Sequence, residues 1–192
     1  MYTEKVEKAL RAASTLHRDQ VRKGPGNPPY VTHLFAAALI VSQYTSDEDV
    51  VVSTILHDTI EDTDYTLEEL EEDFGSRIRE IVQAVTEPKE IKDWSKRKDR
   101  YLKSLKSGPN EALLVAAADK IHNMLSIVRD FTGHEDKFVR EFGGSLDERL
   151  GQYQNFGNLI NSRVKNAIVH EFNTVFMKYK QFLVELETLQ KK

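Results

Sequence analysis

The sequence contains no cysteine among its 192 residues. This absence excludes disulfide bonds, thiolate metal ligands and a cysteine nucleophile. Long apolar runs are also missing, since the longest stretches, such as Phe35 to Val41, are far too short to span a bilayer. The first five residues lack the basic and apolar regions of a secretory signal. We therefore expect a cytoplasmic protein with no membrane partner.

A strong excess of positive charge is absent as well, because the formal net charge is −4. A general nucleic-acid binder needs a basic surface, so we expect no nucleic-acid partner. The basic charge is nevertheless uneven: between Lys89 and Lys106 there are eight Lys or Arg residues and three acids, a local excess of +5. This segment would suit a small anionic ligand, although each of its residues taken alone is more often part of a solvated helix face.

Apolar residues make up 40% of the chain and charged residues 30%, which is typical of a soluble globular protein. The length fits one domain, and we predict a single domain over residues 1–192. Helical periodicity runs nearly throughout and convincing strands are missing, so the predicted fold class is all-α, a single-domain helical bundle. No feature of the sequence specifies an oligomeric state.

The helix boundaries follow from capping residues and from the positions of Pro and Gly. A first helix is predicted over Thr3–Arg22, a second from Thr32, and a third after Ser46 that continues to about Ile60. Thr66-Leu-Glu-Glu predicts a capping box for a short helix that ends at Phe74-Gly75. The remaining helices are predicted at Ser76–Val85, Ser95–Leu105, from Pro109 onward, and at about Ser145–Ile160 and Val164–Leu189.

Four potential metal ligands stand out because of their apolar surroundings: His33, His57, Asp58 and Asp119. A buried, unpaired carboxylate costs several kcal/mol, so each Asp must meet a cation or several donors. Each of the four alone would more often be structural. Together, with separations of 24 and 61 residues on three core-facing helices, they could supply two nitrogens and two oxygens to one divalent cation. Neighbours on a helix point about 100° apart, so His57 and Asp58 can bind from one turn.

This H…HD…D pattern is the signature of the HD phosphohydrolase superfamily, and further segments resemble its RelA/SpoT-type alarmone hydrolases. The resemblance covers about residues 5–130, which would form the catalytic core, with C-terminal helices at about 145–190. The loop between Lys23 and Tyr30 has the length seen in the small stand-alone hydrolases, which include metazoan SpoT homologues. The segments that carry the resemblance are His17–Lys23, Pro29–His33, His57–Thr63, Thr66–Gly75, Val82–Thr86, Trp94–Lys98 and Ala118–Met124.

The resemblance implies a role for each matching residue. One divalent cation, expected to be Mn²⁺, would be held by His33, His57, Asp58 and Asp119. Glu61 and Asp62 match the acidic pair that positions or deprotonates the attacking water. Helical spacing agrees, because Glu61 and Asp62 are each four residues after a ligand and would share one patch.

Substrate contacts are also implied by the resemblance. Arg22 and Lys23 match residues that contact the guanine base and flanking phosphates, and Asn123 matches a nucleotide contact. Within the basic segment, the candidate phosphate contacts are Lys96, Arg97 and Lys98. Leu125 stands where many members have a basic residue, and the resemblance fades beyond about residue 130. His17 is expected to be structural, and His122 either orients a ligand carboxylate or lies at the surface.

The expected activity is metal-dependent hydrolysis of ppGpp or pppGpp at the ribose 3′ position, releasing pyrophosphate. In this reaction Glu61 or Asp62 accepts the proton of the water, and cations stabilise charge on the departing pyrophosphate. One alternative is an HD phosphohydrolase acting on another small phosphorylated compound, such as a dNMP or NADPH. Another is a non-catalytic, metal-stabilised module that binds nucleotides or proteins. The acidic pair argues against the non-catalytic alternative, because a binding module does not need it.

Overall fold

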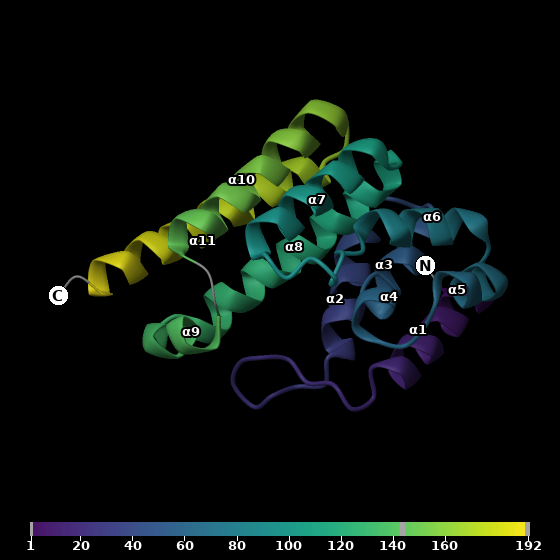
Figure 1. Ribbon diagram of the computed structural model, residues 1–192, viewed down its shortest axis with the longest axis horizontal. Coiled ribbons are helices and arrows are strands. Elements are labelled where there is room, and N and C mark those ends of the chain that lie inside the picture. The colour runs from purple at the N-terminus through teal and green to yellow at the C-terminus, as the bar shows by residue number, and fades with distance from the viewer. Residues whose placement is uncertain (1, 143–144, 191–192) are drawn as a thin grey trace.

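The computed structural model describes residues 2–142 and 145–190. All named secondary-structure elements in these ranges are helices (Figure 1). The prediction of an all-α fold is confirmed. The first half of the chain contains α1 (Glu4–Leu16), α2 (Val31–Val41), α3 (Glu48–Ile55), α4 (Thr59–Asp62), α5 (Leu67–Phe74) and α6 (Ser76–Val85). The second half contains α7 (Trp94–Ser107), α8 (Asn110–Phe131), α9 (Glu135–Glu141), α10 (Leu146–Arg163) and α11 (Ile168–Gln190).

Helix α8 lies at the centre of the bundle, where it packs against α2, α3, α6 and α11 (Figure 1). Its buried residues, from Ala112 to Phe131, point in several directions around the helix axis. A helix that is apolar on most sides belongs in the interior. Asp119 and Lys120 interrupt this apolar sequence. Both line the interior cavity, where α8 borders it. None of the described helices combines the length and apolarity needed to cross a membrane.

Capping fixes the ends of α5 at the predicted places and moves the start of α11 from the predicted one. The Thr66 hydroxyl accepts from the Glu69 N–H, while the Glu69 carboxylate accepts from the Thr66 N–H, so the predicted capping box is present. Gly75 ends α5 with a φ of 90°, which favours glycine. The last helix begins at Ile168 rather than Val164, because the Asn166 side chain accepts from the Ile168 N–H at 2.9 Å.

The predicted first helix, Thr3–Arg22, is too long. Helix α1 ends at Leu16, and the chain then forms a closed loop in which Val21 and Pro29 make an isolated antiparallel bridge. Two backbone bonds close this loop: the Arg22 N–H donates to the Pro28 carbonyl, and the Tyr30 N–H donates to the Gln20 carbonyl, both at 2.9 Å. These long-range bonds satisfy the backbone groups that a longer helix would have satisfied.

The predicted third helix also differs, because α3 ends at Ile55 and does not continue to Ile60. His57 and Asp58 therefore lie in a turn before α4. The side chain of His57 places Nδ1 2.8 Å from the Thr54 carbonyl, which would otherwise accept from the Asp58 N–H in a continuous helix. Thr59 places its hydroxyl on the Leu56 carbonyl at 2.6 Å in the same way. Helix α9 was not predicted.

Candidate active site

A cavity of about 350 Å³ lies between the ligand-bearing elements and two later helices. One side is formed by α2, the turn before α4, and α8, which supply His33, His57, Asp58 and Asp119. The opposite side comes from α7 and α10. These two helices contribute Trp94, Ser95, Lys98, Asp99, Tyr101, Leu102, Glu148, Gly151, Gln152, Tyr153, Asn155 and Phe156. Segments far apart in the sequence thus enclose one space with a strongly polar end.

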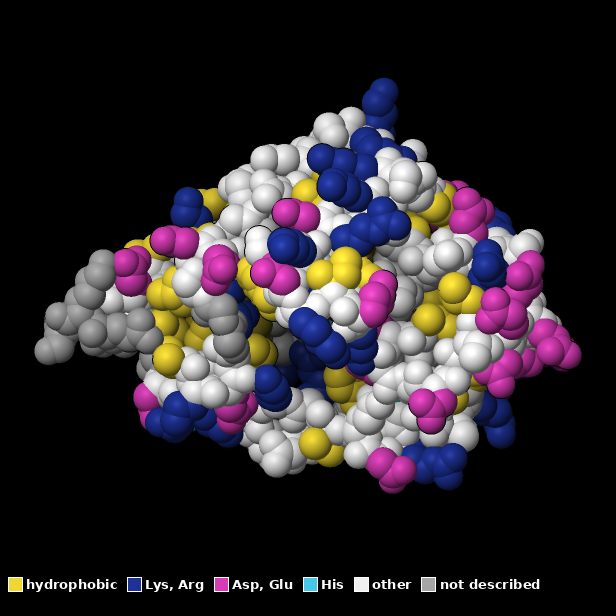
Figure 2. All heavy atoms as spheres, in the orientation of Figure 1, with side chains coloured by type: hydrophobic (Ala, Val, Ile, Leu, Met, Phe, Trp, Pro, Cys, Tyr) yellow, Lys and Arg dark blue, Asp and Glu magenta, His cyan; other side chains and the backbone are white. Residues whose placement is uncertain are grey.

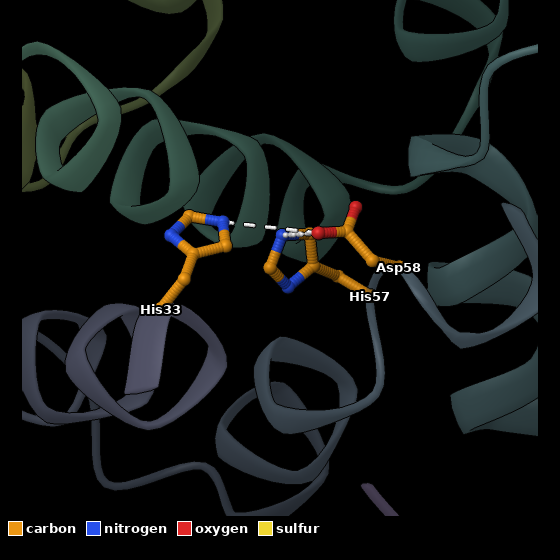
Figure 3. A group of neighbouring side chains, drawn as sticks. All are labelled: His33, His57 and Asp58. Carbon is orange, nitrogen blue, oxygen red and sulfur yellow. Dashed lines mark ion pairs between the residues drawn. The ribbon is translucent and has the colours of Figure 1, made fainter. Parts of the chain in front are cut away.

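The structure brings the four predicted metal ligands together at that end. The ligand atoms of His33, His57 and Asp58 all lie within 4.8 Å of one another (Figure 3). Asp119 reaches the same point from α8, because its Oδ1 lies 3.2 Å from Nε2 of His33 and 3.6 Å from Nε2 of His57. These distances place two imidazole nitrogens and two carboxylates around one centre.

Both histidines direct Nε2 toward this centre because their Nδ1 atoms are engaged elsewhere. Nδ1 of His57 lies on the Thr54 carbonyl, and Nδ1 of His33 lies 2.7 Å from Nδ1 of His122. Nε2 of His57 is buried and makes no hydrogen bond with any described residue, although Oδ2 of Asp58 is 3.2 Å away. A buried nitrogen without a hydrogen bond, set beside two carboxylates, fits a divalent cation. The contacts at Nδ1 are those that fix the tautomer of a metal-binding histidine.

The electrostatics of these groups favour a cation. Burial would raise the pKa of Asp58, but His57 and His33 outweigh it and hold the pKa below its usual range. Burial would likewise raise the pKa of Asp119, but the neighbouring His33 and His57 rings outweigh it and keep this pKa low. Burial lowers the pKa of His33, which keeps it neutral. Burial also acts to lower the pKa of His57, but Asp58 and Asp119 together raise it well above its usual value.

The two predicted acids have different environments. Glu61 lines the cavity, and its Oε2 accepts from the Glu87 N–H at 3.0 Å. Burial, followed by the negative charges of Asp58 and Glu87, raises the pKa of Glu61 to about 7. Asp62 does not line the cavity, and its Oδ1 pairs with Nζ of Lys89 at 2.5 Å. Of the two acids, only Glu61 both lines the cavity and has a pKa near 7, the two properties that proton exchange with a group in the cavity requires.

The three predicted phosphate contacts on α7 also differ in their position relative to the cavity. Lys98 lines the cavity and pairs with the Glu87 carboxylate. Arg97 donates to the Glu87 carboxylate and to the Ile91 carbonyl, and it does not itself line the cavity. Lys96 is exposed and lies away from the cavity. Lys and Arg side chains gather over α7 (Figure 2). Successive helical residues diverge by about 100°, so one of three neighbours can face a given space.

Arg22, Lys23 and Asn123 line a second, smaller cavity of about 220 Å³. Asn123 also lines the first cavity, so the two spaces adjoin. Its side chain donates to Oδ1 of Asp119 at 2.5 Å and accepts from Nη2 of Arg22 at 3.0 Å. Lys23 donates to the Glu141 carbonyl at 2.5 Å. Arg22 is therefore linked to the ligand set, while Lys23 is held by the far end of α9.

Tyr30 and Lys120 are among the cavity residues that sequence reasoning missed. Tyr30 donates its hydroxyl to Oδ2 of Asp58 at 2.6 Å, and it stands three residues before a ligand, one helical turn away. Lys120 lines the cavity directly after Asp119, a position that its segment could have indicated. His122 contacts His33 rather than a carboxylate. His17 is buried, places Nδ1 2.7 Å from Gln20 and stacks on Tyr30, which agrees with a structural role.

Comparison with known proteins places this chain in a family. A family model described as "HD domain" matches residues 9–142. The Mus musculus protein named guanosine-3′,5′-bis(diphosphate) 3′-pyrophosphohydrolase MESH1 is 36% identical over 133 residues, which cover 68% of this chain and 74% of the mouse protein. The Homo sapiens protein of the same name is 37% identical over 119 residues, covering 61% of this chain and 66% of the human one.

A solved structure agrees with the sequence comparison over nearly the whole chain. It is described as a metazoan ortholog of SpoT that hydrolyzes ppGpp and plays a role in starvation responses. The two structures superpose with a TM-score of 0.77 at 27% identity, covering 93% of this chain and 97% of the other. The family model, the relatives and the shared fold lead to one conclusion: the chain belongs to the HD domain family and is similar to the MESH1 proteins.

Proposed function

We propose that the chain is a cytoplasmic, Mn²⁺-dependent phosphohydrolase that removes pyrophosphate from the 3′ position of guanosine polyphosphates such as ppGpp. The observation that carries the proposal is the convergence of His33, His57, Asp58 and Asp119 at one end of a cavity that Glu61 also lines. A structural metal site has no need of a second cavity acid whose pKa is raised to about 7 beside the ligands. The names of the MESH1 relatives supply the substrate class.

His33, His57, Asp58 and Asp119 would hold a divalent cation, which would supply Lewis-acid chemistry by lowering the pKa of the attacking water and polarising a phosphoryl oxygen. The residues of this chain do the remaining work. The Glu61 carboxylate accepts a proton from the attacking water, and the Glu87 N–H holds that carboxylate in place. Oxygen of the water bonds to the phosphorus attached to O3′, and the O3′–P bond breaks. Its electron pair stays on O3′, which takes up a proton to give the ribose hydroxyl.

The cavity is matched to a ligand with both charge and an aromatic part. Its lining is polar near the predicted metal ligands, and Trp94, Tyr101 and Tyr153 provide aromatic surface. The adjoining cavity adds Arg22 and Lys23, which would meet the nucleotide beyond the scissile phosphate. Asn123, shared by both spaces, would contact the nucleotide between them.

A substrate panel tests the proposal. The Mn²⁺-loaded protein would be incubated with ppGpp, GTP, dNMPs and NADPH, with pyrophosphate and inorganic phosphate scored separately. We expect pyrophosphate and GDP from ppGpp. Inorganic phosphate from a dNMP or from NADPH, without turnover of ppGpp, would assign the site to another phosphorylated metabolite. No turnover of any compound, together with tight Mn²⁺ binding, would identify a non-catalytic module.

A further inference from the structure

Lys120 has no part in the mechanism derived above, yet its side chain lies on the cavity wall beside the metal ligands. It follows Asp119 on α8, and only 16% of the side chain is exposed. A lysine is rarely withdrawn from water to this extent, because removing the ammonium group from solvent costs free energy. Its position therefore calls for compensating interactions inside the cavity.

Two aromatic rings from two other helices hold the ammonium group. Nζ lies 4.7 Å from the ring centre of Tyr101 on α7 and 5.2 Å from that of Phe156 on α10. It also donates to the Tyr101 hydroxyl at 3.3 Å. The negative faces of aromatic rings attract a cation, so Lys120 is fixed in place by packing as well as by charge.

The carboxylate paired with Lys120 is that of Asp119, whose Oδ2 lies 3.6 Å from Nζ. Oδ1 of the same carboxylate faces Nε2 of both ligand histidines. A divalent cation at these ligands would therefore compete with Lys120 for the negative charge of the Asp119 carboxylate. With a cation there, Lys120 would be a largely buried positive charge whose counter-charge is engaged elsewhere. Such a group is stabilised by a further anion.

The other lysine of the cavity lining is in a different situation. Lys98 pairs with Glu87, which also accepts from Arg97. Of the two lysines that line the described cavity, Lys120 is thus the one whose partner is also a metal ligand. The space in front of it, between the ligands and the aromatic wall, is where the charged part of a phosphorylated ligand would lie.

We propose that Lys120 contacts the phosphoryl oxygens of the bound substrate and stabilises the negative charge that they carry as the O3′–P bond breaks. The proposal rests on the proposed function, since it assigns a further catalytic residue to the same cavity. Lys120 keeps its proton throughout, and the bonds that form and break are those given above. A cation fixed beforehand by two rings and a hydroxyl needs little reorganisation as the transition state forms.

The first test compares Lys120→Met, Lys120→Arg and the control Lys103→Met, which removes an exposed lysine of α7 outside the cavity lining. All would be assayed on ppGpp at saturating Mn²⁺. We expect Lys120→Met to lower kcat about 10²–10³-fold, the range for loss of one group that stabilises transition-state charge. We expect a smaller change in KM, partial recovery in Lys120→Arg, and wild-type kinetics in Lys103→Met.

The second test needs no turnover, and so it separates this proposal from the proposed function. Inorganic pyrophosphate would be titrated into the Mn²⁺-loaded proteins by calorimetry, with bound Mn²⁺ measured in each. We expect Lys120→Met to retain the metal and to bind pyrophosphate at least about tenfold more weakly than wild type, as for the loss of one charge-assisted hydrogen bond. This result would support Lys120 as a phosphoryl contact even if ppGpp proved not to be the substrate.

Two outcomes would overturn the role of Lys120. One is a Lys120→Met variant with wild-type kcat and wild-type pyrophosphate affinity. The other is a defect in Lys120→Met that added Mn²⁺ removes completely, because Lys120 would then only position Asp119 for the metal. Hydrolysis of ppGpp by the wild type in either case would leave the proposed function standing.

Discussion

The hydroxyl of Tyr30 donates a hydrogen bond of 2.6 Å to Oδ2 of Asp58, so a residue of the closed loop before α2 holds a ligand that lies in the turn before α4. Burial, and then the charge of Asp58, raises the pKa of Tyr30, which keeps the phenol a donor at any physiological pH. The bond orients the carboxylate toward the histidines. Side chains that orient metal ligands in this way are part of the metal site.

The first prediction concerns this bond. Tyr30→Phe should weaken Mn²⁺ binding about 10–100-fold, because the carboxylate of Asp58 loses the donor that orients it. Calorimetric titration with Mn²⁺ measures the change. Tyr65→Phe is the matched control, since Tyr65 donates to the Asp73 carboxylate at 2.8 Å far from the cavity. Equal Mn²⁺ affinity in Tyr30→Phe and Tyr65→Phe would show that the bond does not support the metal.

The second prediction separates metal binding from proton transfer. Asp58→Ala should lose both Mn²⁺ and activity, because it removes a ligand. Glu61→Gln should retain Mn²⁺ and the bond from the Glu87 N–H, but lose about 10²–10⁴-fold in kcat, since an amide cannot accept the proton. Glu90→Gln, an exposed acid in the same region, is the control. A Glu61→Gln variant with wild-type turnover would remove Glu61 from the mechanism.

The sequence was sufficient for the helical fold and for the residues that meet at the cavity end. Apolar periodicity and capping residues are local signals, and the capping box at Thr66 lies where its pattern predicted. The ligands were recognisable because carboxylates beside apolar runs need a partner. The argument that His57 and Glu61 share a continuous helix was nevertheless wrong. Helix α3 ends early because the His57 ring occupies the Thr54 carbonyl, which is a competition that helical periodicity does not reveal.

The long-range parts of the site were the least predictable. The end of α1 at Leu16 depends on backbone bonds to the far side of the 17–30 loop, and no local pattern encodes them. The charge density of the basic segment indicated that α7 contacts an anionic ligand, but not which of its lysines faces the cavity. That depends on which face of α7 packs toward α8 and α10. Lys120 could have been placed near the ligands from its position after Asp119, but its contacts with rings from two other helices are long-range and have no local signal.

The third prediction concerns the packing of α6 against the end of α7. A Cβ added to Gly108 would lie 2.8 Å from Cβ of Ala84 and 3.2 Å from the Ser104 carbonyl oxygen, and neither neighbour can rotate away. Gly108→Ala should therefore lower the free energy of unfolding by about 1–3 kcal/mol, as measured in urea. Gly151→Ala, in the middle of α10 with no atom within 4 Å of its Cβ, should raise it by about 0.5–1 kcal/mol. A change in the free energy of unfolding with the same sign in both variants would refute the tight contact at Gly108.

The fourth prediction is the pH dependence of turnover. Glu61 must be ionised to accept a proton, and its pKa of about 7 in the metal-free protein makes the rate rise with pH. A bound cation lowers this pKa, so the acid limb of the Mn²⁺-saturated enzyme should lie at or below about 7. Glu87→Gln removes a negative charge that raises the pKa of Glu61, and should move the limb to lower pH. Profiles of kcat/KM against pH for wild type, Glu87→Gln and Glu90→Gln would reveal the shift. An unmoved limb in Glu87→Gln would mean that another group sets the profile.

The fifth prediction follows from the charge of His57 in the metal-free protein. Burial acts to lower the pKa of His57, but Asp58 and Asp119 raise it well above 6.5, which favours the imidazolium form in the metal-free protein. A metal ligand must be neutral, and Mn²⁺ binding should therefore release a proton and tighten as pH rises. Calorimetry in two buffers of different ionisation enthalpy counts the protons released, and a count of zero at pH 7 would contradict the assignment.

The raised pKa of His57 also has a consequence for the stability of the metal-free protein. His57 contributes stability that is fully present below pH 6.5 and is lost as pH rises through its folded pKa, so metal-free protein should unfold more easily in alkaline buffer while Mn²⁺-loaded protein should not.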